Sequence, residues 1–156
     1  ALCEEKASLE VIQLILGGKN TYLGCKTTLQ GRESSVNTDT AYIVDGEGRL
    51  DMNYVALHEG KKTQSNMQAG GVLRDHAFKL YRGTIDFKWG AKGAVGNEKE
   101  DVLLLSNDVV NQTIPLILCA EEDMAKVDAV CRKIPDAATQ AKVQKFLGRA
   151  VEEEEA

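Results

Sequence analysis

The stretch Leu50-Asp51-Met52-Asn53-Tyr54-Val55-Ala56 repeats with a period of two, because its first, third, fifth and seventh residues are all apolar. That spacing places the four side chains on one face of a β-strand. The same period recurs on either side, in residues 21–29 and in residues 85–89. The sequence therefore predicts a series of short strands, each with one face turned toward a core.

Glycines recur along the first 93 residues at intervals of 10 to 17 residues, which is the strand-plus-turn spacing of an all-β domain. A sandwich, a barrel and a solenoid all share this spacing. The only strong hairpin dipeptide is Asp45-Gly46. Regular glycine spacing with few hairpin-forming dipeptides favours a solenoid, in which successive strands turn corners instead of doubling back. The marker glycines are Gly18, Gly31, Gly48, Gly60, Gly71, Gly83 and Gly93.

Two continuously apolar runs, Val102–Leu105 and Leu116–Leu118, predict strands that are covered on both faces. No segment before residue 120 has the period of a long helix. We therefore expect residues 1–123 to form a β core.

The pattern changes after Cys119. Apolar residues then recur with the i, i+3, i+4, i+7 spacing of one helix face, first up to Pro135 and again after Asp136, a plausible N-cap. The tail Glu152–Glu155 reads as a solvated end. Residues 124–156 are predicted to be a helical segment whose apolar positions include Val127, Val130, Ile134, Val143, Phe146 and Leu147.

Composition excludes several classes of function. The chain has 156 residues and a net charge of −5, so it lacks the Lys and Arg surplus of a general nucleic-acid-binding surface. No apolar run approaches the roughly 20 residues that span a membrane, and residues 1–6 carry no secretory signal, so we expect a cytoplasmic protein. The four cysteines form no C-x-x-C pair and are expected to be reduced thiols, mostly buried.

Enzyme motifs are largely missing. Residues 60–63 lack the upstream glycine of a phosphate-binding loop, and His58-Glu59 lacks the second histidine of a zinc protease. We interpret His58 and His76 as turn or rim residues beside charged stretches. Residues 98–101 hold three carboxylates that a hard metal could bind, although a solvated turn is the simpler interpretation.

Longer segments carry a family resemblance. Residues 50–75, Ala77–Asp86, Gly96–Leu105 and Ile114–Asp123 closely resemble the C-terminal half of the SufB/SufD family, scaffold components of the SUF iron–sulfur cluster assembly machinery. The resemblance is strong over residues 1–123 and looser over 126–151. It implies a mainly β fold, a right-handed parallel β-helix (solenoid) followed by a small C-terminal α-helical segment, and a non-enzymatic scaffold function.

The resemblance also implies partners. One is a SufC-type ATPase, bound through the C-terminal helices and hence through the apolar positions of residues 127–147. The other is a second SufB/SufD-type β-helix subunit, paired edge to edge as a homodimer or heterodimer. No tightly bound cofactor is expected, and an iron–sulfur cluster would be carried only transiently.

Two departures from the family pattern bear on the metal chemistry. SufB-type members have a cluster-holding cysteine at the position of Glu100, so this chain resembles SufD. Family members also continue after Glu121-Glu122-Asp123 with a His-Gly-Ala segment, whereas Met124 here runs into Ala125, which predicts residues missing near 124–125. The remaining candidate metal contacts are Cys119, the thiol nearest that segment, and Glu100.

Two other functions stay open from the residues alone. Many β-solenoids act on polysaccharides, and Asp51 with Asp86 is the best carboxylate pair for such an enzyme. A purely structural assembly module that never touches cluster is the third hypothesis. The separation of the two carboxylates tests the enzyme hypothesis.

Overall fold

The computed structural model describes residues 1–120, and within that range the chain forms strands and no helix. The predicted helical segment 124–156 lies outside the described residues, as does the junction at Met124 and Ala125. Residues 1–120 accordingly contain no helix long and apolar enough to cross a membrane. The strands are β1 (Leu2–Cys3), β2 (Ser8–Leu16), β3 (Asn20–Leu29), β4 (Ser35–Val44), β5 (Arg49–His58), β6 (Gln64–Leu73), β7 (Phe78–Phe87), β8 (Val95–Leu104) and β9 (Val110–Cys119).

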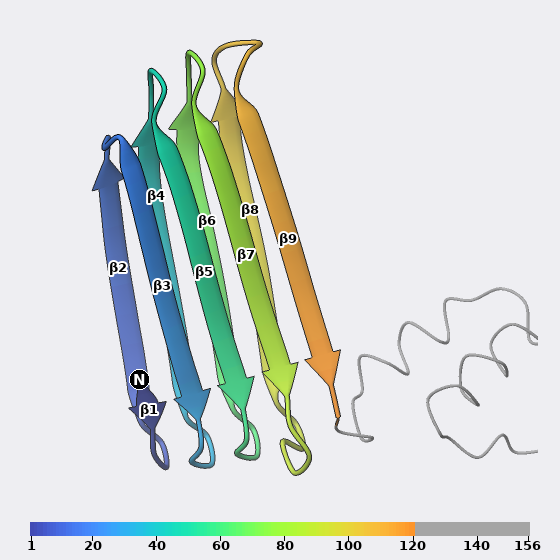
Figure 1. Cartoon of the computed structure of the whole chain (residues 1–156). Coiled ribbons are helices and arrows are strands. Elements are labelled where there is room, and N and C mark those ends of the chain that lie inside the picture. Colours follow the sequence, from blue (N-terminus) through green and yellow to red (C-terminus); the bar gives the residue numbers. More distant parts are fainter. Residues whose placement is uncertain (121–156) are drawn as a thin grey trace, which may run out of the picture. The chain divides into compact units, whose positions relative to one another are not determined.

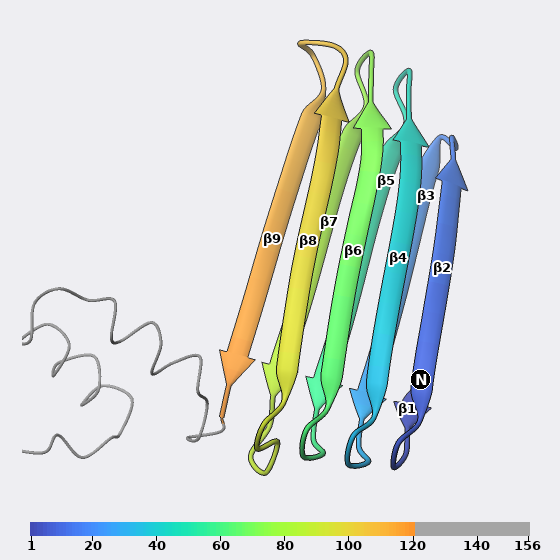
Figure 2. The same ribbon diagram turned by 180° about the vertical axis from the view of Figure 1, so that it is seen from behind.

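The strands form two parallel sheets, and the chain alternates between them at every turn. Sheet A has the order β1-β3-β5-β7-β9, and sheet B has the order β2-β4-β6-β8. In Figure 1 the strands of sheet A run downward in front and those of sheet B run upward behind, while the chain advances from left to right, so the coil is right-handed. Figure 2 shows sheet B from its outer side. This architecture confirms the predicted parallel β-helix, here with about four turns.

The rungs stack in continuous register. β3, β5 and β7 are offset by 29 residues, so that Asn20 pairs with Arg49 and Arg49 pairs with Phe78. Each pairing runs unbroken along the strand, which places equivalent inward side chains in columns between the sheets. The alternation of residues 50–56 is confirmed, because Leu50, Met52, Tyr54 and Ala56 are all buried. Ile85 and Phe87 are also buried, whereas Trp89 is exposed because β7 ends at Phe87.

The apolar runs at the C-terminal end differ from expectation. Leu103, Leu104 and Leu105 are exposed, as are the three residues Leu116–Leu118. The prediction that these strands are covered on both faces was wrong. They lie in the last described rung, β8–β9, or directly after its first strand, and no further described rung stacks on it.

Glycines occupy two kinds of position. Gly31 and Gly60 lie in stacked turns: a Cβ atom on Gly31 would lie 1.9 Å from the Glu5 amide nitrogen, and one on Gly60 would lie 2.5 Å from the Gly31 carbonyl oxygen. Gly71 and Gly83, which the spacing assigned to turns, lie inside strands instead. There they make room for the Tyr42 ring and the Glu98 carboxylate.

His58 is fully buried, so its interpretation as a turn or rim residue was wrong. As the last residue of β5 it faces inward, where Nδ1 lies 2.7 Å from the Thr63 hydroxyl and Nε2 lies 2.8 Å from the Ser65 hydroxyl. Its ring packs against Phe87 with 4.6 Å between centroids. Burial lowers the pKa of His58 to about 4 from its ordinary 6.5.

Acid should therefore destabilise the fold through His58. As pH falls below 6.5, the unfolded chain binds a proton that the folded chain accepts only near pH 4. Between these values the free energy of unfolding should drop by on the order of 3 kcal/mol from this residue. Urea unfolding between pH 7 and pH 4 should show a shallower pH dependence for His58→Gln than for the wild type. The exposed His76 supplies the control: His76→Gln should keep the wild-type profile, and equal profiles for all three proteins would contradict the assignment.

Candidate functional site at the terminal rung

The last described rung presents an open edge. β9 pairs with β7 and β8 pairs with β6, and no other described strand pairs with either one. All ten residues of β9 are exposed. Open edge strands pair readily with other chains, and apolar side chains strengthen that tendency. The exposed large apolar residues of β9 are Val110, Ile114, Leu116, Ile117 and Leu118.

The alternating direction of the backbone N–H groups explains why β9 tolerates Pro115. The N–H groups of Val110 and Ala120 donate to β7-side carbonyls, those of Ala77 and Phe87, at 2.9 and 2.8 Å. Because successive N–H groups in a strand point to opposite edges, even-numbered residues face β7 and odd-numbered residues face the open edge. Pro115 therefore costs no ladder hydrogen bond, and Ile117 directs its N–H outward.

A polar network lines the inward side of this rung. The Lys79 ammonium is fully buried and forms an ion pair with Glu100, whose side chain is 9% exposed. Thr113 donates its hydroxyl to the second carboxylate oxygen, and Tyr42 donates to the first at 3.3 Å. These residues come from β4, β7, β8 and β9, so Glu100 ties the two sheets together beside an open pocket of about 570 Å³.

Burial shifts the pKa values in this interior. It lowers the pKa of Lys79, against the opposing effect of Glu100, and it raises the pKa values of Tyr42 and Tyr81. The pKa of Glu98 is raised by burial and then by the charge of Glu100. The carboxylates of Glu98 and Glu100 thus lie near a single ammonium group, that of Lys79, and Lys79 forms its ion pair with Glu100.

The two predicted metal contacts do not form one site. Cys119 is exposed at the end of β9, six residues beyond Thr113. Six residues of strand span about 20 Å, and the Glu100 carboxylate contacts Thr113. Within residues 1–120 there is no group of three His, Cys, Asp or Glu side chains that could hold a metal ion. The predicted partner-binding residues, Val127 to Leu147, lie outside the described range.

The carboxylate pair of the polysaccharide hypothesis is also far apart. Asp51 pairs with Leu80 across the β5–β7 ladder, and Asp86 lies six residues further along β7. That spacing is about 20 Å, well beyond the roughly 5–10 Å that glycosidases need. Each carboxylate is also ion-paired, Asp51 with Arg82 and Asp86 with Lys88. The pair has no catalytic geometry.

Sequence reasoning missed Lys79 as a member of this site. The signal was present: counting back in steps of two from Ile85 and Phe87 places Lys79 and Tyr81 on the inward face of the same strand. A lysine at an inward position needs a buried partner. The partner, Glu100, lies 21 residues away, and only the fold reveals it.

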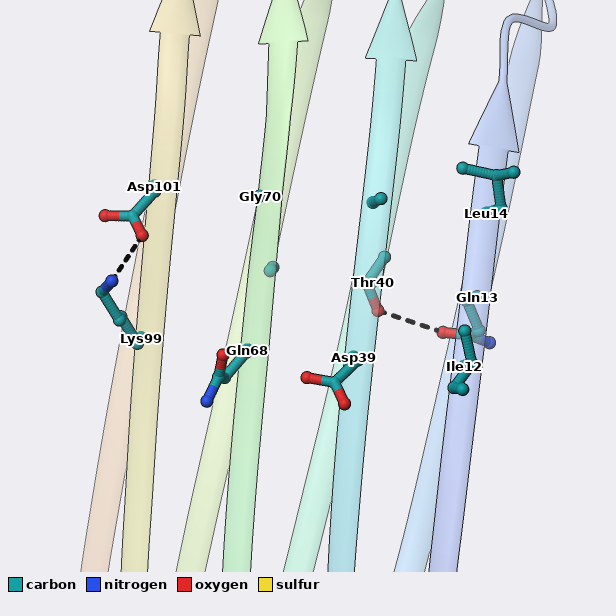
Figure 3. A pocket seen from close by; sticks show the side chains of 11 residues that line it. Ile12, Gln13, Leu14, Asp39, Thr40, Gln68, Gly70, Lys99 and Asp101 are labelled. Atoms are coloured by element: carbon teal, nitrogen blue, oxygen red, sulfur yellow. Dashed lines mark hydrogen bonds and ion pairs between the residues drawn. The ribbon is translucent and has the colours of Figure 1, made fainter.

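A second surface feature lies on the outer face of sheet B. An open groove of about 370 Å³ crosses all four strands there. Figure 3 shows Ile12 and Leu14 of β2 on one side, Lys99 and Asp101 of β8 on the other, and Gly70 of β6 between them. Lys99 and Asp101 form an ion pair at 2.7 Å.

Comparison with known proteins finds one family model, described as "SUF system FeS cluster assembly, SufBD core domain", which matches residues 1–129. An iron–sulfur cluster assembly SufBD family protein of Staphylococcus saprophyticus is 29% identical over 115 residues, covering 73% of this chain and 24% of the relative. The iron–sulfur cluster assembly protein SufD of Bacillus subtilis is 28% identical over 88 residues, covering 55% and 20%. The chain thus spans about a quarter of the length of these relatives.

Proposed function

The chain belongs to the SufBD family, and from this membership we propose that it is a SufD-like, non-enzymatic scaffold subunit of the SUF iron–sulfur cluster assembly complex. It would act in the cytoplasm. The observation that best supports a scaffold is the open terminal rung, where β9 offers exposed apolar side chains and outward amides. Such an edge suits strand addition by a protein partner.

The partner proposed at this edge is a second SufB/SufD-type β-helix subunit, paired strand to strand in a homodimer or heterodimer. A second proposed partner, a SufC-type ATPase, would bind the predicted helices through Val127, Val130, Ile134, Val143, Phe146 and Leu147. This second assignment rests on the helical spacing of the sequence and on the family. We expect no nucleic acid and no membrane among the partners.

An iron–sulfur cluster would be the cargo of the assembly. Clusters usually need about four ligands, so residues 1–120 supply at most part of a set. Of the two candidates, Cys119 is an exposed thiol, and cysteine thiolates are the usual ligands of iron–sulfur clusters, whereas Glu100 is a carboxylate. We therefore assign the contact with transient cluster to Cys119. A purely structural module would give no cluster absorption when the full-length protein is reconstituted with iron and sulfide, alone or with its partner.

Blocking the edge should weaken the pairing of β-helix subunits. In the full-length protein, Ile117→Pro removes an outward N–H while leaving the hydrogen bonds from β9 to β7 in place. We expect at least about tenfold weaker binding of the second subunit, measured by titration calorimetry, with ATPase binding unchanged.

The matched control is Ile117→Ala, which retains the amide and loses only the side chain. It should weaken the pairing less than the proline variant does. Wild-type affinity in Ile117→Pro, with an unchanged melting curve, would place the subunit interface elsewhere.

A further inference from the structure

The interior of the solenoid is open at its last described rung. An open cavity of about 570 Å³ lies there, lined by residues of β7, β8 and β9. In Figure 1, β8 and β9 stand at the end of the row of strands. The second subunit proposed to pair with β9 would meet this same end, so it would also cover the cavity.

Glu98 is a carboxylate of this cavity without a cation. Its Oε2 atom is buried, and no group among residues 1–120 donates a hydrogen bond to it. The fully buried ammonium of Lys79 forms its ion pair with Glu100 instead. Burial raises the pKa of Glu98, and the charge of Glu100 raises it further. A buried carboxylate is stable in its charged form only when a cation accompanies it.

The Tyr81 hydroxyl is a second polar group that points to a ligand. Tyr81 is fully buried, and its hydroxyl makes no hydrogen bond within the described residues. This hydroxyl lies near both carboxylates, because the charges of Glu98 and Glu100 add to burial in raising its pKa. Buried polar atoms are normally hydrogen-bonded. A ligand that carries several N–H groups could donate to the Glu98 carboxylate and to the Tyr81 oxygen together.

The lining of the cavity favours an organic cation over a metal ion. Glu98 is accompanied there by the apolar side chains of Ile85, Val102 and Ile117. Lys and Arg side chains pack their hydrocarbon stems on such surfaces while the charged head reaches a polar group. A metal ion would need more ligands, and residues 1–120 contain no group of three His, Cys, Asp or Glu side chains that could hold one.

A second copy of this chain is a poor source of that cation. Residues 100–120, which include all of β9, contain no Lys, Arg or His. Lys99 is exposed and forms its ion pair with Asp101. Two copies that met through this end would bring together two sets of Glu98 and Glu100, and like charges disfavour that contact. The charges therefore favour a subunit of different sequence.

We propose that Glu98 and Tyr81 form an acceptor site for a Lys or Arg side chain of the second SufB/SufD-type subunit, and that this subunit differs in sequence from the present chain. The stem of the side chain would pack against Ile85 and Val102, and its head would lie against Glu98. The inference rests on the proposed function, because it requires the second subunit to dock at the β9 edge. The backbone of that edge can pair with any strand, whereas the cavity selects a partner with a cation.

Glu98→Gln in the full-length protein tests the site. The change keeps the shape of the side chain, removes its charge and leaves the pair of Lys79 and Glu100 in place. Titration calorimetry should show binding of the second subunit weakened by at least about tenfold. Urea unfolding of the variant alone should show unchanged or higher stability, because an unpaired buried charge has been removed. A merely structural role for Glu98 predicts that affinity and stability both fall.

The matched control is Asp101→Asn, which removes the same charge from the same strand at an exposed position. It should bind the second subunit like the wild type. Wild-type affinity in Glu98→Gln, or equal weakening in both variants, would overturn the cation site and leave the scaffold function standing. If the wild type itself does not bind the second subunit, the proposed function fails and this inference fails with it. If Glu98→Gln instead dissociates a homodimer of the full-length protein in sedimentation equilibrium, a second copy supplies the cation and the inference is overturned.

Discussion

Replacing Lys79 with methionine should lower the free energy of unfolding by about 3–5 kcal/mol. Lys79 is fully buried, and its ammonium is the cation paired with the nearly buried Glu100. The variant leaves that carboxylate inside the solenoid with only the hydroxyls of Thr113 and Tyr42 as partners. A buried carboxylate without a cation destabilises the rung, because no countercharge offsets the loss of its hydration. Urea unfolding monitored by circular dichroism measures the loss.

A double-variant cycle identifies the source of that loss. Lys79→Met combined with Glu100→Met removes both charges and should be clearly less destabilised than the sum of the two single variants. The exposed pair of Lys99 and Asp101 supplies the surface comparison, and Lys99→Met should change stability by no more than about 1 kcal/mol. If the double variant loses as much free energy of unfolding as the two single variants combined, the ion pair between Lys79 and Glu100 does not stabilise the rung.

Replacing Gly31 with alanine should destabilise the protein by more than about 4 kcal/mol or prevent folding. The new Cβ atom would lie 1.9 Å from the Glu5 nitrogen and 2.1 Å from the Glu4 carbonyl carbon. Both are backbone atoms of the turn stacked against Gly31, so no side chain can move aside. Thermal unfolding and soluble yield of the full-length protein measure the effect.

Gly24→Ala is the matched control within the same strand-and-turn segment. Its Cβ would lie 3.8 Å from the nearest atom, and alanine restricts the unfolded chain more than glycine does, so stability should hold or rise slightly. A melting temperature for Gly31→Ala within a few degrees of that of Gly24→Ala would contradict the close stacking of these turns.

Local pattern predicted the strands and favoured a solenoid over a sandwich or a barrel, whereas the parallel β-helix was implied by the family resemblance. The period of two in residues 50–56 follows from the pleated backbone of a strand, and the scarcity of hairpin dipeptides follows from a chain that does not double back on itself. The apolar runs near Leu104 and Ile117 led to a wrong prediction of burial. Their hydrophobicity indicates that a neighbouring element could cover them, but these residues lie at the last described rung. The exposure of side chains at the end of a solenoid depends on the element that packs against that end. The sequence of the terminal strand alone does not identify this element.

The candidate site was less predictable because its contacts join distant residues. Residues 98–101 read locally as a solvated acidic turn, yet the fold turns Glu98 and Glu100 inward and sets Lys79 against the latter. His58 was misread for the same reason, since its charged neighbours in sequence do not surround it in space. Its partners, Thr63 and Ser65, become visible only once the chain turns from β5 into β6.

Co-assembly of the full-length protein with its proposed partners is the decisive test of the scaffold function. The full-length protein would be expressed together with a SufC-type ATPase and a second SufB/SufD-type subunit, purified by a tag on itself alone, and sized by multi-angle light scattering. We expect one stoichiometric complex that contains all three proteins. Recovery of the tagged protein by itself, with both other proteins in the unbound fraction, would contradict a scaffold role in iron–sulfur cluster assembly.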